Sequence, residues 1–174
     1  NAEAELKMAD MFDICHGGGL DLCALGLAEI DAMGNVNVSK FHGRVTGPGG
    51  FIDLAQHKKK LILMGTFTAG GLREHCEGGR LVIDREGKYQ KFKTDIEQVT
   101  FSGDYAAAHG QHVLVVTERA VFRLTPQGLM LTEIAPGVDL ERDILSQMEF
   151  RPLIADDLQL MDGRIFPPNP KGLS

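Results

Sequence analysis

The sequence predicts an α/β protein built on a mixed sheet with antiparallel hairpins. A run of apolar residues at 61–64 follows a short helical pattern, which is typical of a buried parallel strand. Short strands separated by turn residues fill positions 80–134, which is typical of an antiparallel meander. A chain that mixes crossovers with hairpins in this way belongs to the α/β class.

The first third of the chain predicts a helix, a hairpin and a second helix. Residues 1–12 are rich in helix formers, and the glycines at 17–19 interrupt that segment. Apolar residues alternate over 21–39 on both sides of a turn at 31–35, which predicts a β-hairpin. Residues 51–56, directly after a glycine-rich loop, predict one or two helical turns.

The remaining two thirds predict mostly strands. A hairpin joins 80–84 to 88–92, and further strands cover 96–101, 112–117, 120–125 and 129–134, with a helical turn at 105–109. Asp139 is a suitable N-cap for an amphipathic helix that carries Leu140, Ile144 and Met148 on one face. We therefore expect one domain over residues 1–154 and an extended tail over 155–174.

Composition excludes several classes of protein. The net charge of −6 argues against a nucleic-acid binder, which would show a basic face. Apolar runs are strand-sized and far below the ~20 residues of a membrane helix, so we expect no membrane partner. The three cysteines are an odd number without a CxxC pair, which indicates a reducing, cytoplasmic compartment.

The most informative local feature is the loop Gly47-Pro48-Gly49-Gly50. Glycines ahead of a helix leave backbone N–H groups unshielded, which suits an anion or a developing oxyanion. Its expected partner is the segment 65–67 at the carboxyl end of the parallel strand, where ligands of open α/β sheets collect. The alternative is a turn that needs several glycines and contacts nothing.

No residue set nominates a metal site or a nucleophile. The pairs Cys15-His16 and His75-Cys76 are adjacent, so on a strand each pair offers one ligand rather than two. Cys76 has no base in its sequence surroundings, and no GxSxG motif is present. We expect Glu77 to be a solvated loop carboxylate.

Several ordered blocks resemble the C-terminal half of the family I acyl-CoA transferases, the single-chain acetate/propionate type in particular. These blocks cover residues 17–22, 25–29, 34–39, 47–51, 65–72 and 133–140. The resemblance implies the fold that CoA transferases share with sugar-phosphate isomerases (NagB/RpiA/CoA transferase-like). It also implies a homo-oligomer, short-chain acyl-CoA and carboxylate substrates, and coenzyme A as a substrate with no resident cofactor.

The activity implied by the resemblance is a ping-pong transfer of CoA through a glutamyl-CoA thioester. Gly49 and Gly50 are expected to donate their backbone N–H groups to the oxyanion. Gly47, Phe51, Gly65, Thr66, Phe67 and Arg44 are the expected substrate or CoA contacts.

The chain departs from the family in one respect: it lacks the Glu-Ser-Gly-type segment that carries the nucleophile. We therefore expect a partial domain that begins after the catalytic glutamate and is inactive alone, its partner being the N-terminal half of the same protein. Two alternatives stay open. One is a non-catalytic binding module of the same fold, and the other is a related acyl-CoA hydrolase.

Overall fold

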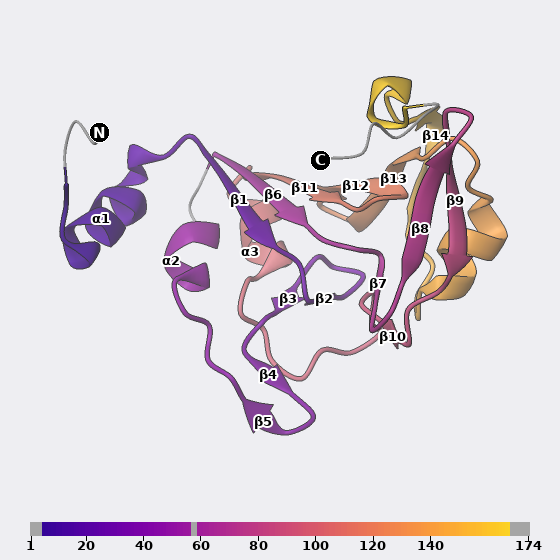
Figure 1. The fold of residues 1–174 in the computed structure, drawn as a ribbon. Coiled ribbons are helices and arrows are strands. Elements are labelled where there is room, and N and C mark those ends of the chain that lie inside the picture. Colours follow the sequence, from indigo (N-terminus) through magenta and orange to yellow (C-terminus); the bar gives the residue numbers. More distant parts are fainter. Residues whose placement is uncertain (1–4, 57–58, 168–174) are drawn as a thin grey trace.

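A six-stranded sheet organises the computed structural model, which describes residues 5–56 and 59–167 (Figure 1). The strands lie in the order β1-β6-β11-β12-β13-β14. β1, β6 and β11 are parallel, β12 and β13 continue antiparallel, and β14 is parallel to β13. Their bounds are Leu22–Gly26, Lys60–Met64, His112–Val116, Ala120–Thr125, Gly128–Ile134 and Leu153–Leu160. The predicted α/β class with a mixed sheet is confirmed.

The apolar run after the second helix is the parallel strand that the sequence predicts. β6 pairs with β1 on one side and β11 on the other. Leu61 and Leu63 point to one face and are fully buried, because helices cover that face. Strands β11, β12 and β13 confirm the predicted strands over 112–134.

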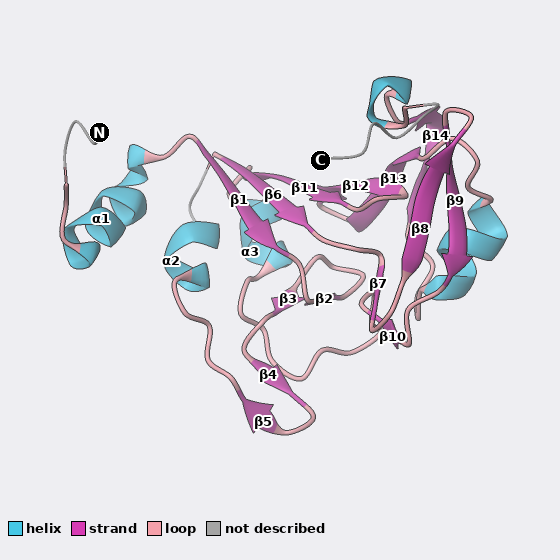
Figure 2. Cartoon of the chain, viewed as in Figure 1, coloured by secondary structure: helices cyan, strands magenta, loops and turns pink. Residues whose placement is uncertain are grey.

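Among the described residues, three short α-helices accompany the sheet; Figure 2 shows them in cyan together with the irregular helical turns. α2 and α3 contact one face of the sheet, whereas α1 lies to the side of it (Figure 1). Their bounds are Met8–Ile14 for α1, Phe51–Ala55 for α2 and Gly103–Ala108 for α3. Four irregular helical turns cover Cys15–Gly19, Leu140–Ile144, Leu145–Gln147 and Gly163–Ile165. The expected helices near 51–56 and 105–109 are confirmed, while the N-terminal helix starts later than expected; residues 1–4 lie outside the described residues.

Four two-stranded ribbons surround the sheet. They pair β2 with β3, β4 with β5, β7 with β10 and β8 with β9. In chain order these strands span Glu29–Ile30, Val36–Asn37, Lys40–Phe41, Arg44–Val45, Thr68–Ala69, Arg73–Glu77, Arg80–Arg85 and Tyr89–Gln90.

The hairpin predicted over 21–39 is wrong in its first arm. The turn at 31–35 is present, and Asp31 accepts the backbone N–H groups of Met33 and Asn35. It joins only the two-residue strands β2 and β3. The longer strand β1 instead pairs in parallel with β6, because Cys23 and Leu25 there join the main core.

Two further predictions in the meander are wrong. β9 pairs with β8 through the turn at Gly78-Gly79, whereas β10 pairs with β7, so 80–84 and 88–92 form no hairpin. The stretch 96–101 makes a single bridge, Phe101 to Val36, rather than a strand. β9 therefore pairs with the strand before it rather than the one after it, and β10 and Phe101 each pair with a segment farther away in the sequence.

The C-terminal region keeps the predicted N-cap but not the regular helix. Asp139 Oδ1 accepts the N–H of Arg142 at 2.7 Å. The following turns are π-type and 3₁₀, and Ile144 and Met148 are buried. β14 crosses position 154, where the expected division between domain and tail falls, so residues 155–160 belong to the sheet.

In the part of the chain that the structure describes, no helix is long and apolar enough to cross a membrane.

Candidate functional site

The glycine-rich loop leaves two backbone donors unused. It connects β5 to α2, and its first turn is closed by Ser39, whose carbonyl accepts from Gly47 N at 3.1 Å. Phe51 N donates back to Pro48 O at 3.1 Å. Within residues 5–56 and 59–167, neither Gly49 N nor Gly50 N has an acceptor. These two N–H groups are therefore available to a ligand.

The loop is held from both sides by aromatic rings. Phe51 is buried in the main core, so it anchors the start of α2 rather than offering its ring to a ligand. The ring of Phe12, on α1, packs against Gly50, 2.8 Å from the position that a Cβ there would take. Because α2 has only five residues, the loop's chemistry depends on its free N–H groups rather than on a helix dipole.

Arg44 stands on the exposed β4–β5 hairpin, just before the loop. Glu97 fixes the tip of that hairpin, because its carboxylate accepts the backbone N–H groups of His42 and of Gly43, the latter at 2.8 Å. These bonds, that of Gly43 first, lower the pKa of Glu97 below its usual value. His42 has φ of 52°, a conformation that the carboxylate stabilises.

The predicted contact segment 65–67 lies at the carboxyl edge of the sheet, and its residues differ in how far they are exposed. Thr66 is exposed and Gly65 half-buried. Phe67 is fully buried and stacks on Phe92 with ring centroids 4.5 Å apart. The structure therefore places Gly65 and Thr66 at the surface and the ring of Phe67 in the core.

A buried arginine, which the sequence analysis did not single out, braces this edge. Arg119 donates to Glu118 Oε1 at 2.7 Å, to Glu86 Oε1 at 2.5 Å and to the carbonyl of Asp143 at 3.0 Å. The second oxygen of Glu118 accepts the N–H of Phe67 at 2.8 Å. The Arg119 cluster (Arg119, Glu118 and Glu86) thus fixes the backbone directly after β6.

Lys91 places a positive charge beside the same edge. Its Nζ donates to the carbonyl of Leu27, the residue after β1, at 3.2 Å, and lies 3.1 Å from where a Cβ on Gly65 would sit. Burial lowers the pKa of Lys91, and the attraction of Glu118 opposes that effect. The sequence does not distinguish Lys91 from the surface lysines, because the residues that it contacts lie far from it along the chain.

The edge cleft, as we call it, is a cavity of about 710 Å³ that opens onto Lys91. It lies between the residues that follow β1, the β4–β5 hairpin and strand β10. Its lining includes Leu27, Phe41, His42, Ala69, Tyr89 and Lys91. Of its other charged groups, Lys93 forms an ion pair with Glu149, and Glu29 accepts from Asn37 at 2.7 Å. The glycine-rich loop is not part of this lining.

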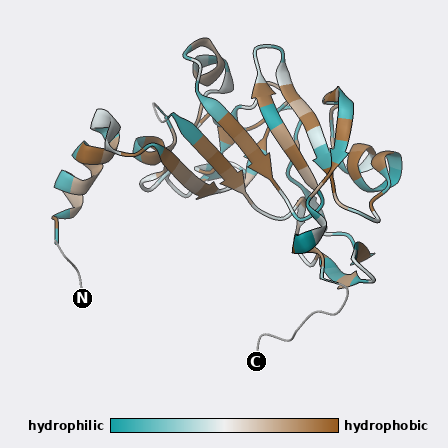
Figure 3. Ribbon diagram, turned by 90° about the horizontal axis from the view of Figure 1, so that it is seen from above, coloured by the Kyte–Doolittle hydropathy of each residue, from teal (hydrophilic) through white to brown (hydrophobic). Residues whose placement is uncertain are grey.

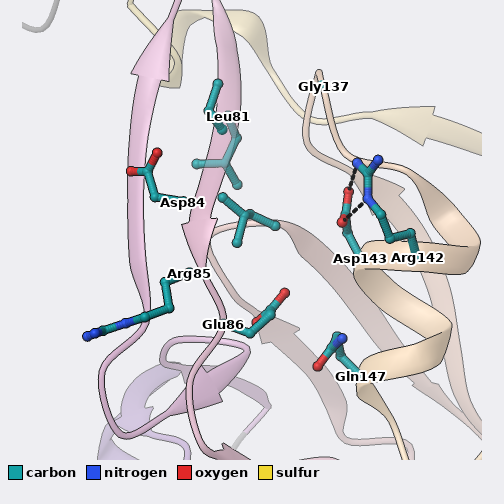
Figure 4. A pocket seen from close by; sticks show the side chains of 10 residues that line it. Leu81, Asp84, Arg85, Glu86, Gly137, Arg142, Asp143 and Gln147 are labelled. Carbon is teal, nitrogen blue, oxygen red and sulfur yellow. Dashed lines mark hydrogen bonds and ion pairs between the residues drawn. The ribbon is translucent and has the colours of Figure 1, made fainter.

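A second cavity, of about 510 Å³, lies between β9 and the turn at 140–144 (Figure 4). Arg142 binds both carboxylate oxygens of Asp143, at 2.7 and 2.8 Å. The N–H of Asp139 also donates to Asp143. These bonds, that of Arg142 first, lower the pKa of Asp143. The other charged side chains of this cavity are also engaged, Asp84 with His75, Arg85 with the carbonyl of Gly71 and Glu86 with Arg119, so its architecture is that of a structural contact.

The adjacent cysteine and histidine pairs point apart. Cys15 is buried while the His16 side chain is 57% exposed, and Cys76 packs on the smaller core while His75 pairs with Asp84 at 2.9 Å. Among the described residues, no group of three His, Cys, Asp or Glu side chains could hold a metal ion.

Comparison with known proteins identifies relatives over almost the whole chain. Acetate CoA-transferase YdiF of Escherichia coli K12 is 51% identical over 166 residues, covering 95% of this chain and 31% of the relative. Caffeate CoA-transferase of Acetobacterium woodii is 48% identical over 175 residues, covering 95% of this chain and 32% of that protein. No family model matches the chain.

A solved structure agrees with these matches. The acyl-CoA transferase YdiF of E. coli O157:H7, in a thioester complex with CoA, superimposes with a TM-score of 0.93 at 50% identity. The superposition covers 96% of this chain and 33% of that one. The chain therefore spans about a third of the length of the relatives it matches, and within that third the fold is the same.

Proposed function

Because the chain is homologous to one third of the family I CoA-transferases, we propose that it forms one wall of the active site of an acyl-CoA:carboxylate CoA-transferase. In this proposal coenzyme A enters as a substrate, and no resident cofactor takes part. The observation that carries the proposal is the pair of unused N–H groups at Gly49 and Gly50, on a loop fixed by Phe12 and Phe51.

The proposed reaction has two halves. A glutamate carboxylate attacks the thioester carbonyl of acyl-CoA, the thiolate of CoA leaves, and an acyl-glutamyl anhydride forms. The thiolate then attacks the glutamyl carbonyl and releases the first acid, which leaves a glutamyl-CoA thioester. A second carboxylate reverses these steps and departs as the new acyl-CoA.

Each attack places negative charge on a carbonyl oxygen, which Gly49 N and Gly50 N stabilise in this proposal. Removing one such donor typically lowers kcat by about 10²–10³. Gly47 contributes by donating to the carbonyl of Ser39, which closes the turn that precedes the two free N–H groups. Phe51 contributes as an anchor of that turn.

In this proposal the edge cleft supplies a positive charge, from Lys91, to the negatively charged substrate carboxylate. Lys91 lies beside Gly65, and it is held by a backbone carbonyl rather than by a carboxylate ion pair. It attracts the substrate carboxylate, which carries a negative charge before attack. In the complete enzyme, Lys91→Met is expected to raise the KM for the acceptor acid about tenfold, whereas Lys91→Arg, which keeps the charge, is expected to retain most of the affinity. An unchanged KM in Lys91→Met would exclude this role.

Arg44 is proposed to meet a phosphate of CoA from its exposed hairpin. Phe67 fits the proposal only as a core residue, whose backbone forms part of the carboxyl edge of the sheet. An unchanged KM for acyl-CoA in Arg44→Ala would dismiss the phosphate contact.

The nucleophile has to come from polypeptide outside residues 1–174, because the chain has no Glu-Ser-Gly-type segment. We propose that this polypeptide is the N-terminal half of the same protein. The relatives act on different acids, acetate and caffeate by name, so short-chain substrates rest on the family resemblance. A cytoplasmic homo-oligomer is also part of the proposal, the location resting on the odd number of cysteines and the lack of a CxxC pair.

A chimera tests the proposal. Residues 1–174 replace the matched third of E. coli YdiF, and CoA transfer from acetyl-CoA to a panel of short carboxylates is measured with the intact YdiF as control. Transfer by the chimera, with none by the chain alone, is the expected result. Release of CoA without an acceptor would indicate a hydrolase. A folded chimera that neither transfers nor hydrolyses would indicate a non-catalytic module.

A further inference from the structure

The two faces of the central sheet differ in what covers them. Pleating puts alternate residues on opposite faces, and the register aligns Ala24, Ile62, Leu114 and Arg123 across four strands. The face that carries Leu61 and Leu63 is packed under α2 and α3 within the main core. The other face carries the aligned row. We call it the open face, defined by Leu22, Ala24, Lys60, Ile62, Met64, His112, Leu114 and Arg123.

Large apolar side chains on the open face are exposed. Leu22 and Met64 are each 50% exposed and Leu114 is 37% exposed. Figure 3, which views the sheet from this side, shows the parallel strands in front, brown over much of their length, with no described helix above them. Parallel strands normally have both faces covered, because crossovers place helices on each. In the described part of the chain this face is covered only at one end, where Leu81, Met161 and Phe166 pack with Val116 and Val121.

The open face is hollowed and rimmed by positive charge. A groove of about 520 Å³ runs over Leu22, Ile62 and Leu114. Lys60, His112 and Arg123 also line it. No carboxylate among residues 5–56 and 59–167 forms an ion pair with Lys60 or Arg123. An apolar floor with a cationic rim fits a helix that carries apolar side chains flanked by carboxylates.

The edge strand beside the open face is also unpaired. β1 bonds β6 on one side, and its other edge has no strand partner among the described residues. That edge lacks the charged or proline residues that usually protect an exposed strand, since its sequence is Leu-Cys-Ala-Leu-Gly. The open face and the open edge meet at Leu22, so one additional segment of polypeptide could cover both.

We propose that the open face docks an amphipathic, acid-flanked helix from the other two thirds of the CoA-transferase. This inference rests on the proposed function, since the relatives are about three times as long as the region they share with this chain. A second copy of the chain fits less well. A two-fold contact would bring together two faces that are both rimmed by the unpaired cations Lys60 and Arg123.

The test compares one substitution in two settings. Leu114→Glu is introduced into the chain alone and into the YdiF chimera, and thermal unfolding of each is followed. In the chain alone Leu114 is at the surface, so Tm is expected to change little. In the chimera the carboxylate is buried under the docked helix, and Tm is expected to fall by roughly 5 °C or more.

Val99→Glu is the matched control, because Val99 is 54% exposed and lies in a loop away from the open face. It is expected to leave both melting temperatures unchanged. Equal effects of Leu114→Glu in the chain and the chimera would overturn the proposal. So would a dimer of the chain that Leu114→Glu dissociates, since the occupant would then be a second copy.

A second measurement does not depend on the stability of a variant. Peroxide oxidation of Met64 is followed by mass spectrometry in the chain and in the chimera, with Met33, 38% exposed in the turn before β3, as internal reference. Met64 is expected to be protected at least about fivefold in the chimera and Met33 to be unaffected. Equal oxidation of Met64 in both would overturn the docking. Protection in a chimera without transfer activity would reject the proposed function and leave the docking standing.

Discussion

The glycine-rich loop and the Arg119 cluster are both polar, and both adjoin segments expected to meet substrate, yet they use their hydrogen bonds in opposite ways. Arg119 is fully buried, and Glu86, Glu118 and a backbone carbonyl accept its donors. At the loop, Gly49 N and Gly50 N are left without an acceptor among the described residues. Buried polar groups are almost always satisfied within the protein, so unused donors at the surface distinguish a ligand-facing loop from a structural brace.

The largest expected effect is on stability and follows from removing the charge of the Arg119 cluster. Arg119→Met would leave Glu118 and Glu86 without their cation, and breaking a buried pair in this way typically costs about 3–5 kcal/mol of unfolding free energy. Urea unfolding of the chain measures it. Arg142→Ala, which removes an arginine with a 74% exposed side chain, is the control and is expected to change stability far less. Equal losses of unfolding free energy in the two variants would mean that the buried Arg119 contributes no more to stability than the exposed Arg142.

The next effect concerns the loop and is seen in rate rather than stability. Gly49 has φ of 55°, which a β-branched residue adopts only with strain, and nothing lies within 4 Å of the position that its Cβ would take. Gly49→Val is therefore expected to move the free N–H groups and lower kcat of the chimera about tenfold or more.

Gly49→Asn is the matched variant, because asparagine tolerates this backbone region. It is expected to keep most of the activity. If both variants were equally active, the loop would not be placing donors at the reacting carbonyl.

A smaller effect tests how the loop is held. An added methyl in Gly50→Ala would press on the ring of Phe12, and the overpacking is expected to cost about 1 kcal/mol. Because the contact is with the outer edge of that ring, the shorter side chain in Phe12→Leu is expected to relieve most of the cost. Urea unfolding of both single variants and the double variant gives the coupling. Additive costs would show that α1 does not pack on the loop.

The smallest effect is electrostatic and lies away from both regions. The hydrogen bond that His75 donates to the carboxylate of Asp84 raises the pKa of His75 above its usual value. A raised pKa gives stability that is present below the unfolded pKa of about 6.5 and is lost as pH rises through the folded value. Stability of the chain should therefore fall relative to Asp84→Asn as pH rises above about 6.5, by a small amount that salt reduces. Parallel pH curves for the two proteins would contradict this.

Local patterns predicted those parts of the fold whose partners are close in sequence or whose burial is complete. The apolar run of β6 and the alternation of β11 to β13 are examples. β1 was assigned to a hairpin because a good turn follows it, but its actual partner begins 38 positions later, at Lys60. No turn signal reports a parallel pairing of that kind.

The candidate site shows the same limit. The loop at 47–50 was visible because clustered glycines are unusual. Arg119 and Lys91 were not, because a charged residue next to a turn reads as exposed. Their environment depends on Glu86, which is 33 positions from Arg119, and on Leu27, which is 64 positions from Lys91. Phe67 was expected to contact substrate, yet three distant aromatic and charged groups enclose its ring.

The most direct measurement is mass spectrometry of trapped intermediates. The chain alone and the YdiF chimera are each incubated with acetyl-CoA, digested and searched for a hydroxylamine-sensitive CoA adduct. We expect an adduct on a glutamate outside residues 1–174 in the chimera, and none on the chain alone. An adduct on any carboxylate within residues 1–174 would contradict it, because this chain would then carry the nucleophile itself.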